Sequence, residues 1–329
     1  MSRSDVSAYR PGRFVLDKYE LVEPVAEGTM GVVWLARHST LDIDVAVKLP
    51  SSAESGAGSQ LRAFTEARMA AQLLHPAVCR VLDFGLTAEG DPCVVTEWLE
   101  GETLASTLAR EGKLPATEAV QLLLPVLEAL SMAHAHGIVH QDVKPENLFL
   151  ARDEQQRLLP KVLDFGIARE RHRRASWLRA GLISGTPYYM SPEQASGRED
   201  IDHRADIWSA CATLYEVIAG RPPFDGETCE VVLAQVVGDA PKPLFEHGGG
   251  DSWLSALVDR GLEKDRDRRY ASIGELATAL ASWLIDQGVE TDATGQSLRV
   301  RFGVNTTPEQ SRVSWTRPLQ TTEVAIDWR

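Results

Sequence analysis

The feature that most constrains the fold is a change of hydrophobic period near Gly101. From Tyr19 to about Glu97 the chain consists of short runs rich in Val, Leu and aromatic residues, separated by Gly or polar turns, which are typical of strands. Residues 61–74 are the exception, because their apolar residues recur at helical spacing. After Gly101 the apolar residues recur with a period near 3.6, which predicts helices. We therefore expect a small sheet-rich lobe with one helix, joined near 97–101 to a larger, mainly helical lobe.

The same patterns give the expected elements. The expected strands are 19–26, 31–38, 42–49, 78–85 and 92–99. The expected helices of the second lobe are 103–112, 116–137, 204–220, 228–238, 252–263 and 272–288. Beyond about residue 287, alternating apolar residues at 298–304 allow a strand, but a flexible appendage is the interpretation we favour.

Charge and cysteine content exclude several classes of function. The net charge of −13 argues against general binding to nucleic acids or anionic membranes, because both need a basic face. The four cysteines contain no Cys-x-x-Cys pair, which disfavours zinc and disulfides and fits a reducing, cytoplasmic location. The N-terminus lacks the apolar segment of an export signal. The longest apolar stretch, 119–139, is interrupted by Gln121, Pro125 and Glu128, so we expect a buried helix and no membrane span.

Two segments of the first lobe suggest a phosphate site. Gly28 and Gly31, between two expected strands, would let the backbone approach a phosphate chain closely, although a plain hairpin fits them equally well. Lys48 ends an apolar strand, and helical spacing turns Glu66 inward, where a carboxylate needs a cation. The two could pair beside a phosphate, or Lys48 could be a surface lysine and Glu66 could reach water.

The stretch from Gly137 to Leu150 packs several polar side chains between apolar runs. Asp142 could orient an attacking hydroxyl and take its proton, and Lys144 could neutralise a moving phosphoryl group. Asn147 offers an amide oxygen, a suitable ligand for Mg²⁺, and Asp164 offers a carboxylate. A helix-capping loop would explain Asp142 or Asn147 singly, but not the whole set. Phosphoryl transfer needs charge placement more than covalent chemistry, which these side chains provide.

In this order and spacing, the motifs resemble the eukaryotic-like (Hanks-type) serine/threonine protein kinases of bacteria. The matching segments, over about 19–284, are AEGTMGVV, VAVK, Glu66, HQDVKPEN, DFG, GTPYYMSPE, DIWS and Arg269. The resemblance implies an α+β, bilobal protein-kinase-like fold, with a small antiparallel β-sheet N-lobe (19–98) and a larger, mainly helical C-lobe (99–284). An extension (1–18) would precede this domain and a tail (285–329) would follow it.

The resemblance also implies the roles of the catalytic residues. Asp142 would be the catalytic base, and Asn147 and Asp164 would bind Mg²⁺, with Mn²⁺ as the alternative ion. Lys144 and Thr186 would share contacts around the base and the transferred phosphate, which implies transfer to Ser or Thr and not to Tyr.

The implied ATP site lies mostly in the first lobe. Lys48, paired with Glu66, would hold the α- and β-phosphates. Adenine would lie between the side chains of Val25, Val33, Ala46 and Phe149. The backbone of Glu97 and Leu99 would bond adenine, and Thr96 would guard the back of the pocket. The Gly-rich loop would contribute Val25, Ala26, Glu27, Gly28, Thr29, Met30, Gly31, Val32 and Val33.

Two further contacts are implied outside the nucleotide site. Glu193 would pair with Arg269 and tie the substrate-binding segment to the helical lobe. Asp206 would brace the backbone around His140.

The sequence departs from the family pattern at two positions. Ala26 stands where the family usually has glycine, and we expect a modest effect on nucleotide affinity. Gln141 replaces the usual arginine beside the base, so no buried cation waits there for a phosphate on the activation segment. We therefore expect catalysis without phosphorylation of that segment.

The partners implied are protein substrates with Ser or Thr acceptors. Arginines between Arg169 and Arg179 could attract an acidic substrate, receive a phosphate on Ser176, or simply form a solvated charge run. The sequence leaves the oligomeric state open. The alternative functions are a pseudokinase scaffold without turnover and, less well supported, a small-molecule phosphotransferase, which would not need GTPYYMSPE.

Overall fold

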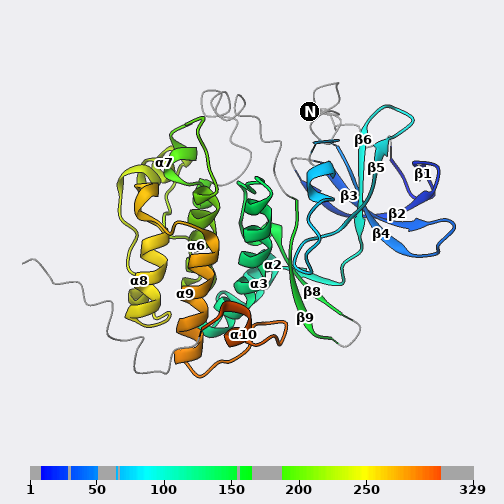
Figure 1. The fold of residues 1–329 in the computed structure, drawn as a ribbon. Coiled ribbons are helices and arrows are strands. Elements are labelled where there is room, and N and C mark those ends of the chain that lie inside the picture. Colours follow the sequence, from blue (N-terminus) through cyan, green and yellow to red (C-terminus); the bar gives the residue numbers. More distant parts are fainter. Residues whose placement is uncertain are drawn as a thin grey trace, which may run out of the picture.

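The computed structural model describes residues 9–28, 31–50, 64–65, 67–153, 156–164 and 187–304. These residues form a sheet-rich N-lobe and a helical C-lobe (Figure 1). The N-lobe contains a six-stranded antiparallel sheet in the order β1-β2-β3-β4-β6-β5. Its strands are β1 (Phe14–Val15), β2 (Tyr19–Gly28), β3 (Gly31–His38), β4 (Asp44–Leu49), β5 (Val81–Leu86) and β6 (Pro92–Glu97). The five expected strands are confirmed, and residues 64–65 and 67–70, within the expected helix 61–74, are helical.

The alternation along β4 explains why this sheet has one core face. Val45, Val47 and Leu49 are buried, whereas Ala46 and Lys48 between them are only partly buried. Successive side chains of a strand point to opposite faces, so the first three belong to the N-lobe core and the other two to the second face. That second face carries residues expected in the ATP site.

The C-lobe contains the six helices expected from the sequence. They are α2 (Leu104–Glu111), α3 (Ala116–Ala135), α6 (Arg204–Ala219), α7 (Cys229–Gly238), α8 (Ser252–Gly261) and α9 (Ile273–Asp286). Two shorter helices, α5 (Pro192–Ala195) and α10 (Leu298–Phe302), were not expected. Neither were the 3₁₀ turns Pro145–Asn147, Pro187–Tyr189, Leu244–His247 and Arg266–Arg268.

A small sheet lies where the C-lobe meets the N-lobe. It has the order β7 (Gly101–Thr103), β8 (Leu148–Arg152) and β9 (Leu158–Val162), with antiparallel pairing. These strands were not expected from the sequence. They frame the stretch that carries the expected catalytic residues, and the isolated bridge between Val78 and Val162 connects β9 to the N-lobe side.

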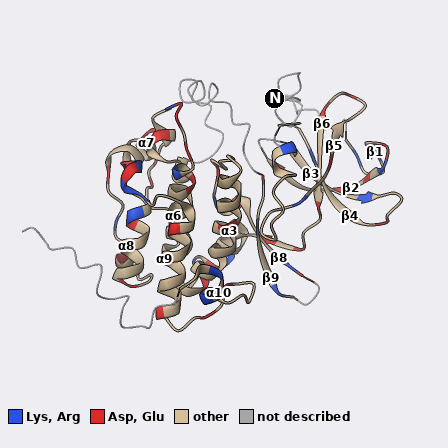
Figure 2. Ribbon diagram, viewed as in Figure 1, with Lys and Arg blue, Asp and Glu red and all other residues tan. Residues whose placement is uncertain are grey.

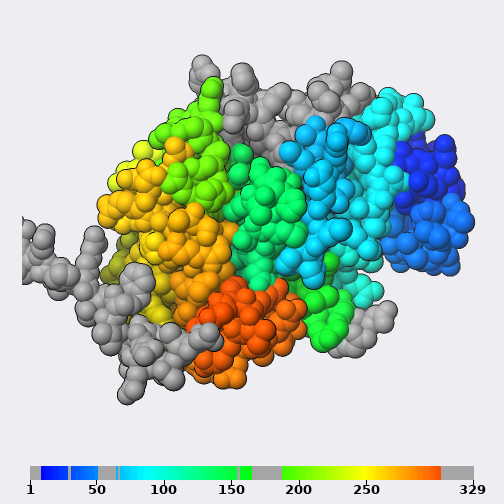
Figure 3. Space-filling model, in the orientation of Figure 1, coloured from blue at the N-terminus to red at the C-terminus, as the bar shows by residue number. Residues whose placement is uncertain are grey.

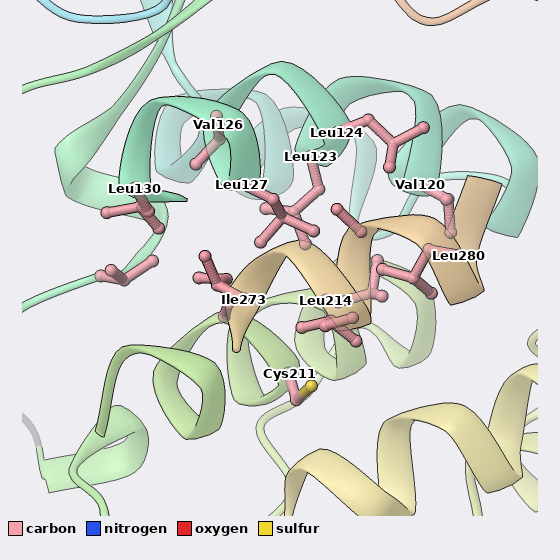
Figure 4. Packing of buried hydrophobic residues seen from close by; sticks show 14 of the residues in the cluster. Val120, Leu123, Leu124, Val126, Leu127, Leu130, Cys211, Leu214, Ile273 and Leu280 are labelled. Carbon is pink, nitrogen blue, oxygen red and sulfur yellow. The ribbon is translucent and has the colours of Figure 1, made fainter. Parts of the chain in front are cut away.

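Helix α3 is the centre of the C-lobe core. Its side chains Leu124, Leu127 and Leu130 are completely buried, and Figure 4 shows α3 packed against residues of α6 and α9. By length and composition alone α3 could cross a membrane, but most of it is buried inside this lobe. The expected buried helix is therefore confirmed.

The proline inside α3 leaves a backbone carbonyl free to bind the segment that follows α9. Pro125 has no N–H group, so the carbonyl of Gln121, four residues earlier, loses its usual helical donor. That carbonyl accepts a hydrogen bond from the backbone N–H of Ala293 at 3.2 Å. In return, Nε2 of Gln121 donates to the carbonyl of Thr291 at 2.9 Å.

Residues 287–304 therefore correct the expectation for this part of the tail. They are not a flexible appendage, and 298–304 is not a strand, because Leu298–Phe302 forms α10. The helix places Leu298, which is fully buried, and Phe302 on one face against the core, and leaves Val300 86% exposed. Figure 3 shows this segment, in orange-red, lying against the green part of the C-lobe surface. Residues 305–329 lie outside the described part of the chain.

Arg301 anchors α10 between two carboxylates. It forms ion pairs with Glu128 of α3 and with Asp292, whose side chain is fully buried. Figure 2 shows the basic residues of α10 at this docking surface. Burial raises the pKa of Glu128, although the Arg301 charge opposes that shift, so the cluster depends on this arginine.

Replacing Arg301 with alanine should destabilise the protein by about 3 kcal/mol, because it leaves two poorly solvated carboxylates without their shared cation. Urea unfolding at pH 7 measures the change in the free energy of unfolding. The control is Arg299→Ala, since the Arg299 side chain is 40% exposed on the same helix and should matter by less than about 0.5 kcal/mol. Equal stabilities of the two variants would contradict this account of the docking.

Candidate active site

The second face of the N-lobe sheet brings together several residues expected to bind ATP. Val33 lies opposite Lys48, and Ala46 lies opposite Thr96, in the registers of β3, β4 and β6. Directly opposed residues share a face, so these four side chains lie on one surface. The Lys48 ammonium contacts Oδ2 of Asp164 at 2.7 Å, which shows that this surface is turned toward the C-lobe.

The hairpin between β2 and β3 approaches the same face. Its last pair is Gly28 with Gly31, and Gly31 has a φ of +137°. A Cβ at Gly31 would lie 2.0 Å from the carbonyl oxygen of Leu49, so only glycine fits there. Among the described residues, a Cβ at Gly28 would meet no atom within 4 Å, so no described side chain blocks a close approach of a ligand to the backbone there. Val25, in the same strand as Gly28, is 44% exposed.

The side chain of Asp142, the expected base, contacts two other expected site residues. Oδ2 of Asp142 accepts a hydrogen bond from Nδ2 of Asn147 at 3.0 Å and lies 3.0 Å from the Lys144 ammonium. Asn147 also donates to the backbone carbonyl of Asp142 at 2.8 Å, because the turn that begins at Pro145 folds the chain back. These bonds use the amide nitrogen of Asn147, so its amide oxygen is the atom that could act as a metal ligand.

A buried carboxylate holds the backbone just before Asp142. The side chain of Asp206, fully buried on α6, accepts hydrogen bonds from the backbone N–H of His140 at 2.8 Å and of Gln141 at 2.6 Å. Nε2 of His134 lies 2.8 Å from the same carboxylate. Gln141 has a φ of +64°, a conformation that non-glycine residues rarely adopt. The expected brace by Asp206 is therefore present.

Further hydrogen bonds tie Leu163, the residue before Asp164, to the same loop. The carbonyl of Leu163 lies 3.1 Å from Nε2 of His140, and its N–H donates to the carbonyl of Asn147 at 2.8 Å. Asp164 itself has a φ of +40°. Partial removal from water raises the pKa of Asp164, but the adjacent Lys48 ammonium outweighs this and holds the pKa below its usual value. The carboxylate is thus ionised near neutral pH.

The oxygen donors fit a divalent metal that is also bound by phosphates. Among the described residues, no group of three or more His, Cys, Asp and Glu side chains could hold a metal alone. Mg²⁺ usually takes one or two carboxylates and completes its shell with phosphate oxygens and water. Asp164 and the amide oxygen of Asn147 suit that kind of site.

The segment that joins the lobes contacts a residue that was not expected from the sequence, Lys161. Glu97 ends β6, and its side chain contacts Lys161 of β9. Thr96, Leu99 and Phe149, also expected near adenine, are partly exposed. A lysine within the otherwise apolar run LLPKV was the available signal for Lys161, but its partner lies 64 residues away in the sequence.

The expected pair of Glu193 and Arg269 is present and buried. Oε1 and Oε2 of Glu193 each accept a hydrogen bond from the guanidinium at 2.8 Å, and the side chains are 4% and 0% exposed. Burial would raise the pKa of Glu193, but the hydrogen bonds and charge of Arg269 hold it below its ordinary value. The pair ties α5 to the segment that precedes α9.

Several expected site residues lie outside the described part of the chain. They are Thr29 and Met30 of the hairpin tip, Glu66, and Thr186. The arginines expected to attract an acidic substrate lie there too. The pairing of Lys48 with Glu66 therefore stays a prediction.

The chain resembles known proteins over most of its length. Residues 19–280 match the protein kinase domain family. The serine/threonine-protein kinase pkn2 of Myxococcus xanthus is 41% identical over 83% of this chain and 33% of its own length. The serine/threonine-protein kinase PknB of Mycolicibacterium smegmatis is 36% identical over 84% of this chain and 44% of its own. The chain thus spans a third to less than half of these relatives.

The fold is also similar to a solved structure. The crystal structure of the kinase domain of Mycobacterium tuberculosis PknI has a TM-score of 0.67 and 26% sequence identity. The match covers 84% of this chain and 99% of that one.

Replacing Glu193 with glutamine should destabilise the protein at pH 7 by about 3 kcal/mol, because the buried Arg269 loses its counter-charge. A carboxyl group whose pKa is lowered on folding stabilises the folded protein at pH values above its ordinary pKa of 4.5. This contribution is lost as the pH falls below 4.5 and through the lowered pKa. The difference between wild type and variant should therefore shrink below pH 4.5. Unfolding measured from pH 7 to pH 3 tests this, with the exposed Glu199→Gln as control. A difference that does not change with pH would contradict it.

Proposed function

Because the chain belongs to the protein kinase family, we propose that it is a serine/threonine protein kinase that uses ATP and Mg²⁺. The reaction is transfer of the γ-phosphoryl group of ATP to a Ser or Thr hydroxyl of a protein. The observation that carries the proposal is the contact of Asp142 with both Lys144 and Asn147, beside the Lys48–Asp164 pair. A base, cations and candidate metal ligands are thereby gathered at one point.

Asp142 acts as the general base in this proposal. Its carboxylate orients the substrate hydroxyl and takes its proton while the hydroxyl oxygen bonds to the γ-phosphorus. The bond from that phosphorus to the oxygen shared with the β-phosphate breaks, and ADP leaves. Lys144, 3.0 Å from Asp142, places a positive charge where the transferred group passes. Asn147 and Asp164 would hold Mg²⁺, which neutralises phosphate charge when bound.

The N-lobe face binds the nucleotide in this proposal. The ammonium of Lys48 and the backbone at Gly28 hold the phosphates, and the open space around Gly28 supports such an approach. The adenine base packs among Val33, Ala46 and Phe149, together with the half-exposed Val25. The backbone of Glu97 and Leu99 provides its hydrogen bonds, and Thr96 lines the back of the pocket.

Gln141 makes this kinase independent of activation-segment phosphorylation in our proposal. Its backbone is held by Asp206 through the N–H and by Nε2 of Gln194 through the carbonyl at 3.1 Å. Both contacts come from neutral or anionic groups of the C-lobe itself, and the glutamine side chain carries no charge that a phosphate would balance. The catalytic loop thus has its support without a phosphate.

Asp142→Asn should lower the rate of transfer by about 10²–10⁴-fold, because the amide cannot accept the proton. Its nucleotide affinity should stay near that of wild type. Incorporation of ³²P from labelled ATP into the protein and into a generic protein substrate measures transfer, and calorimetry measures ADP binding. The exposed Asp239→Asn is the matched control. Unchanged transfer in Asp142→Asn would contradict the role, and nucleotide binding without transfer by the wild type would establish the pseudokinase alternative.

Ser176→Ala combined with Ser184→Ala should leave activity within about threefold of wild type, since no arginine at position 141 requires a phosphate. Phosphatase-treated wild type should behave in the same way. In contrast, Gln141→Arg should make activity fall and become sensitive to phosphatase, because a buried cation then lacks a partner. Loss of activity in the double alanine variant, with recovery in a phosphomimetic variant, would refute the proposal.

A further inference from the structure

A second ion pair joins the two lobes, away from the Lys48–Asp164 pair. Nζ of Lys161 donates to Oε1 of Glu97 at 2.8 Å, and the two side chains are only 11% and 22% exposed. The same carboxylate oxygen accepts a hydrogen bond from the backbone N–H of Arg80 at 2.8 Å. A largely buried ion pair is costly to desolvate unless further hydrogen bonds complete it, and Arg80 supplies one. The pair therefore connects β9, the end of β6 and the residue before β5.

The two ion pairs lie at different positions along the lobe junction, and their N-lobe residues, Lys48 and Glu97, point to opposite faces of the sheet. In the pairing of β4 with β6, Lys48 lies opposite Val94 and Glu97 lies opposite Val45. Three residues of strand separate these positions, which corresponds to about 10 Å. On the C-lobe side, Lys161 and Asp164 are likewise three residues apart. Lys48 and Asp164 belong to the phosphate end in the proposed function, so the Glu97–Lys161 pair belongs to the base end.

The register of the small sheet supports the same placement. Lys161 of β9 lies directly opposite Phe149 of β8, so the two side chains share one face of the sheet. Phe149 is the C-lobe residue proposed to pack against adenine. Glu97 is the residue whose backbone is proposed to bond it, and its N–H already donates to the carbonyl of Arg80 at 3.0 Å. Lys161 thus contacts Glu97 and faces the same side of the small sheet as Phe149, the two residues proposed to meet the base.

We propose that the Glu97–Lys161 pair is a positioning device for adenine, with Lys161 as a further specificity-determining residue of the nucleotide site. Lys161 does not touch the phosphates. It fixes the Glu97 side chain, and through it the direction of the Glu97 carbonyl relative to Phe149. The inference rests on the proposed function, because it assigns the base end of that same nucleotide site. It adds a residue whose loss should weaken recognition of the base and spare the chemical step.

Variants of Lys161 separate this role from a purely structural one. Lys161→Met keeps the length of the side chain and removes the charge, Lys161→Arg keeps the charge, and Lys113→Met removes an exposed lysine elsewhere. Calorimetry gives the affinities for adenosine and for ATP, steady-state assays give KM for ATP and kcat, and thermal melting without nucleotide reports folding. Lys48→Met is the contrasting variant, since it acts at the phosphate end.

Lys161→Met should weaken the binding of adenosine and of ATP by the same factor, about tenfold. It should raise KM for ATP, while kcat changes by less than about threefold. Lys161→Arg should stay within about twofold of wild type, and Lys113→Met should not differ from it. Lys48→Met should weaken the binding of ATP and leave the binding of adenosine unchanged. Glu97→Gln should act in the same direction as Lys161→Met, and the double variant should be no weaker than Lys161→Met, because both substitutions disrupt one interaction.

The proposal would be overturned by any of the following outcomes. One is a Lys161→Met variant with wild-type affinity for adenosine, and another is a loss of ATP affinity without a loss of adenosine affinity. A third is a fall in kcat with an unchanged KM. If Lys161→Met does not fold, Glu97→Gln becomes the test. Wild-type affinity of Glu97→Gln for adenosine would then contradict the proposed role of the pair. A wild type that binds neither adenosine nor ATP would instead defeat the proposed function, and this inference with it.

Discussion

The carboxylate of Asp206 is the interaction on which the candidate site depends. It is completely buried, and an ionised carboxylate there would be costly unless its oxygens were bonded. Two of the hydrogen bonds that it accepts come from the backbone N–H groups of His140 and Gln141. The hydrogen bonds that compensate for the burial of Asp206 therefore also hold Gln141 in a left-handed conformation. That conformation turns the chain so that Asp142 meets Lys144. A buried carboxyl group in the C-lobe core thereby determines the direction of a partly exposed one.

Two ion pairs of opposite polarity connect the lobes. Lys48 reaches Asp164, and Glu97 reaches Lys161, so each lobe contributes one cation and one anion. In the proposed function, nucleotide phosphates and a metal would compete for the first pair, while the base would leave the second intact. In that proposal the first pair is the exchangeable contact of the lobe junction and the second stays in place.

The sequence could predict whatever depends on local spacing. The long helices and the N-lobe strands have clear periods, and the closely spaced Asp142 and Asn147 indicated a reactive loop. The strands of the small sheet were missed because each has only three to five residues. Helix α10 was missed because Leu298, Val300, Phe302 and Val304 suit a strand, and only docking of Leu298 against the core decides for a helix. Lys161 was missed because its meaning comes from a partner that is remote in sequence.

The polar residues and the proline that interrupt the apolar run of α3 bind the segment that follows α9. Gln121 and Glu128 are seven residues apart, two turns of helix, and therefore lie on one face. The first bonds the segment 291–293 through its backbone and side chain, and the second pairs with Arg301. Pro125, between them, frees the carbonyl that receives Ala293. Features that argue against a membrane span thus form the docking face for residues beyond the matched kinase domain, which ends at residue 280. The polar residues within this core helix indicated a contact with the segment after α9, which the apolar pattern of that segment did not predict.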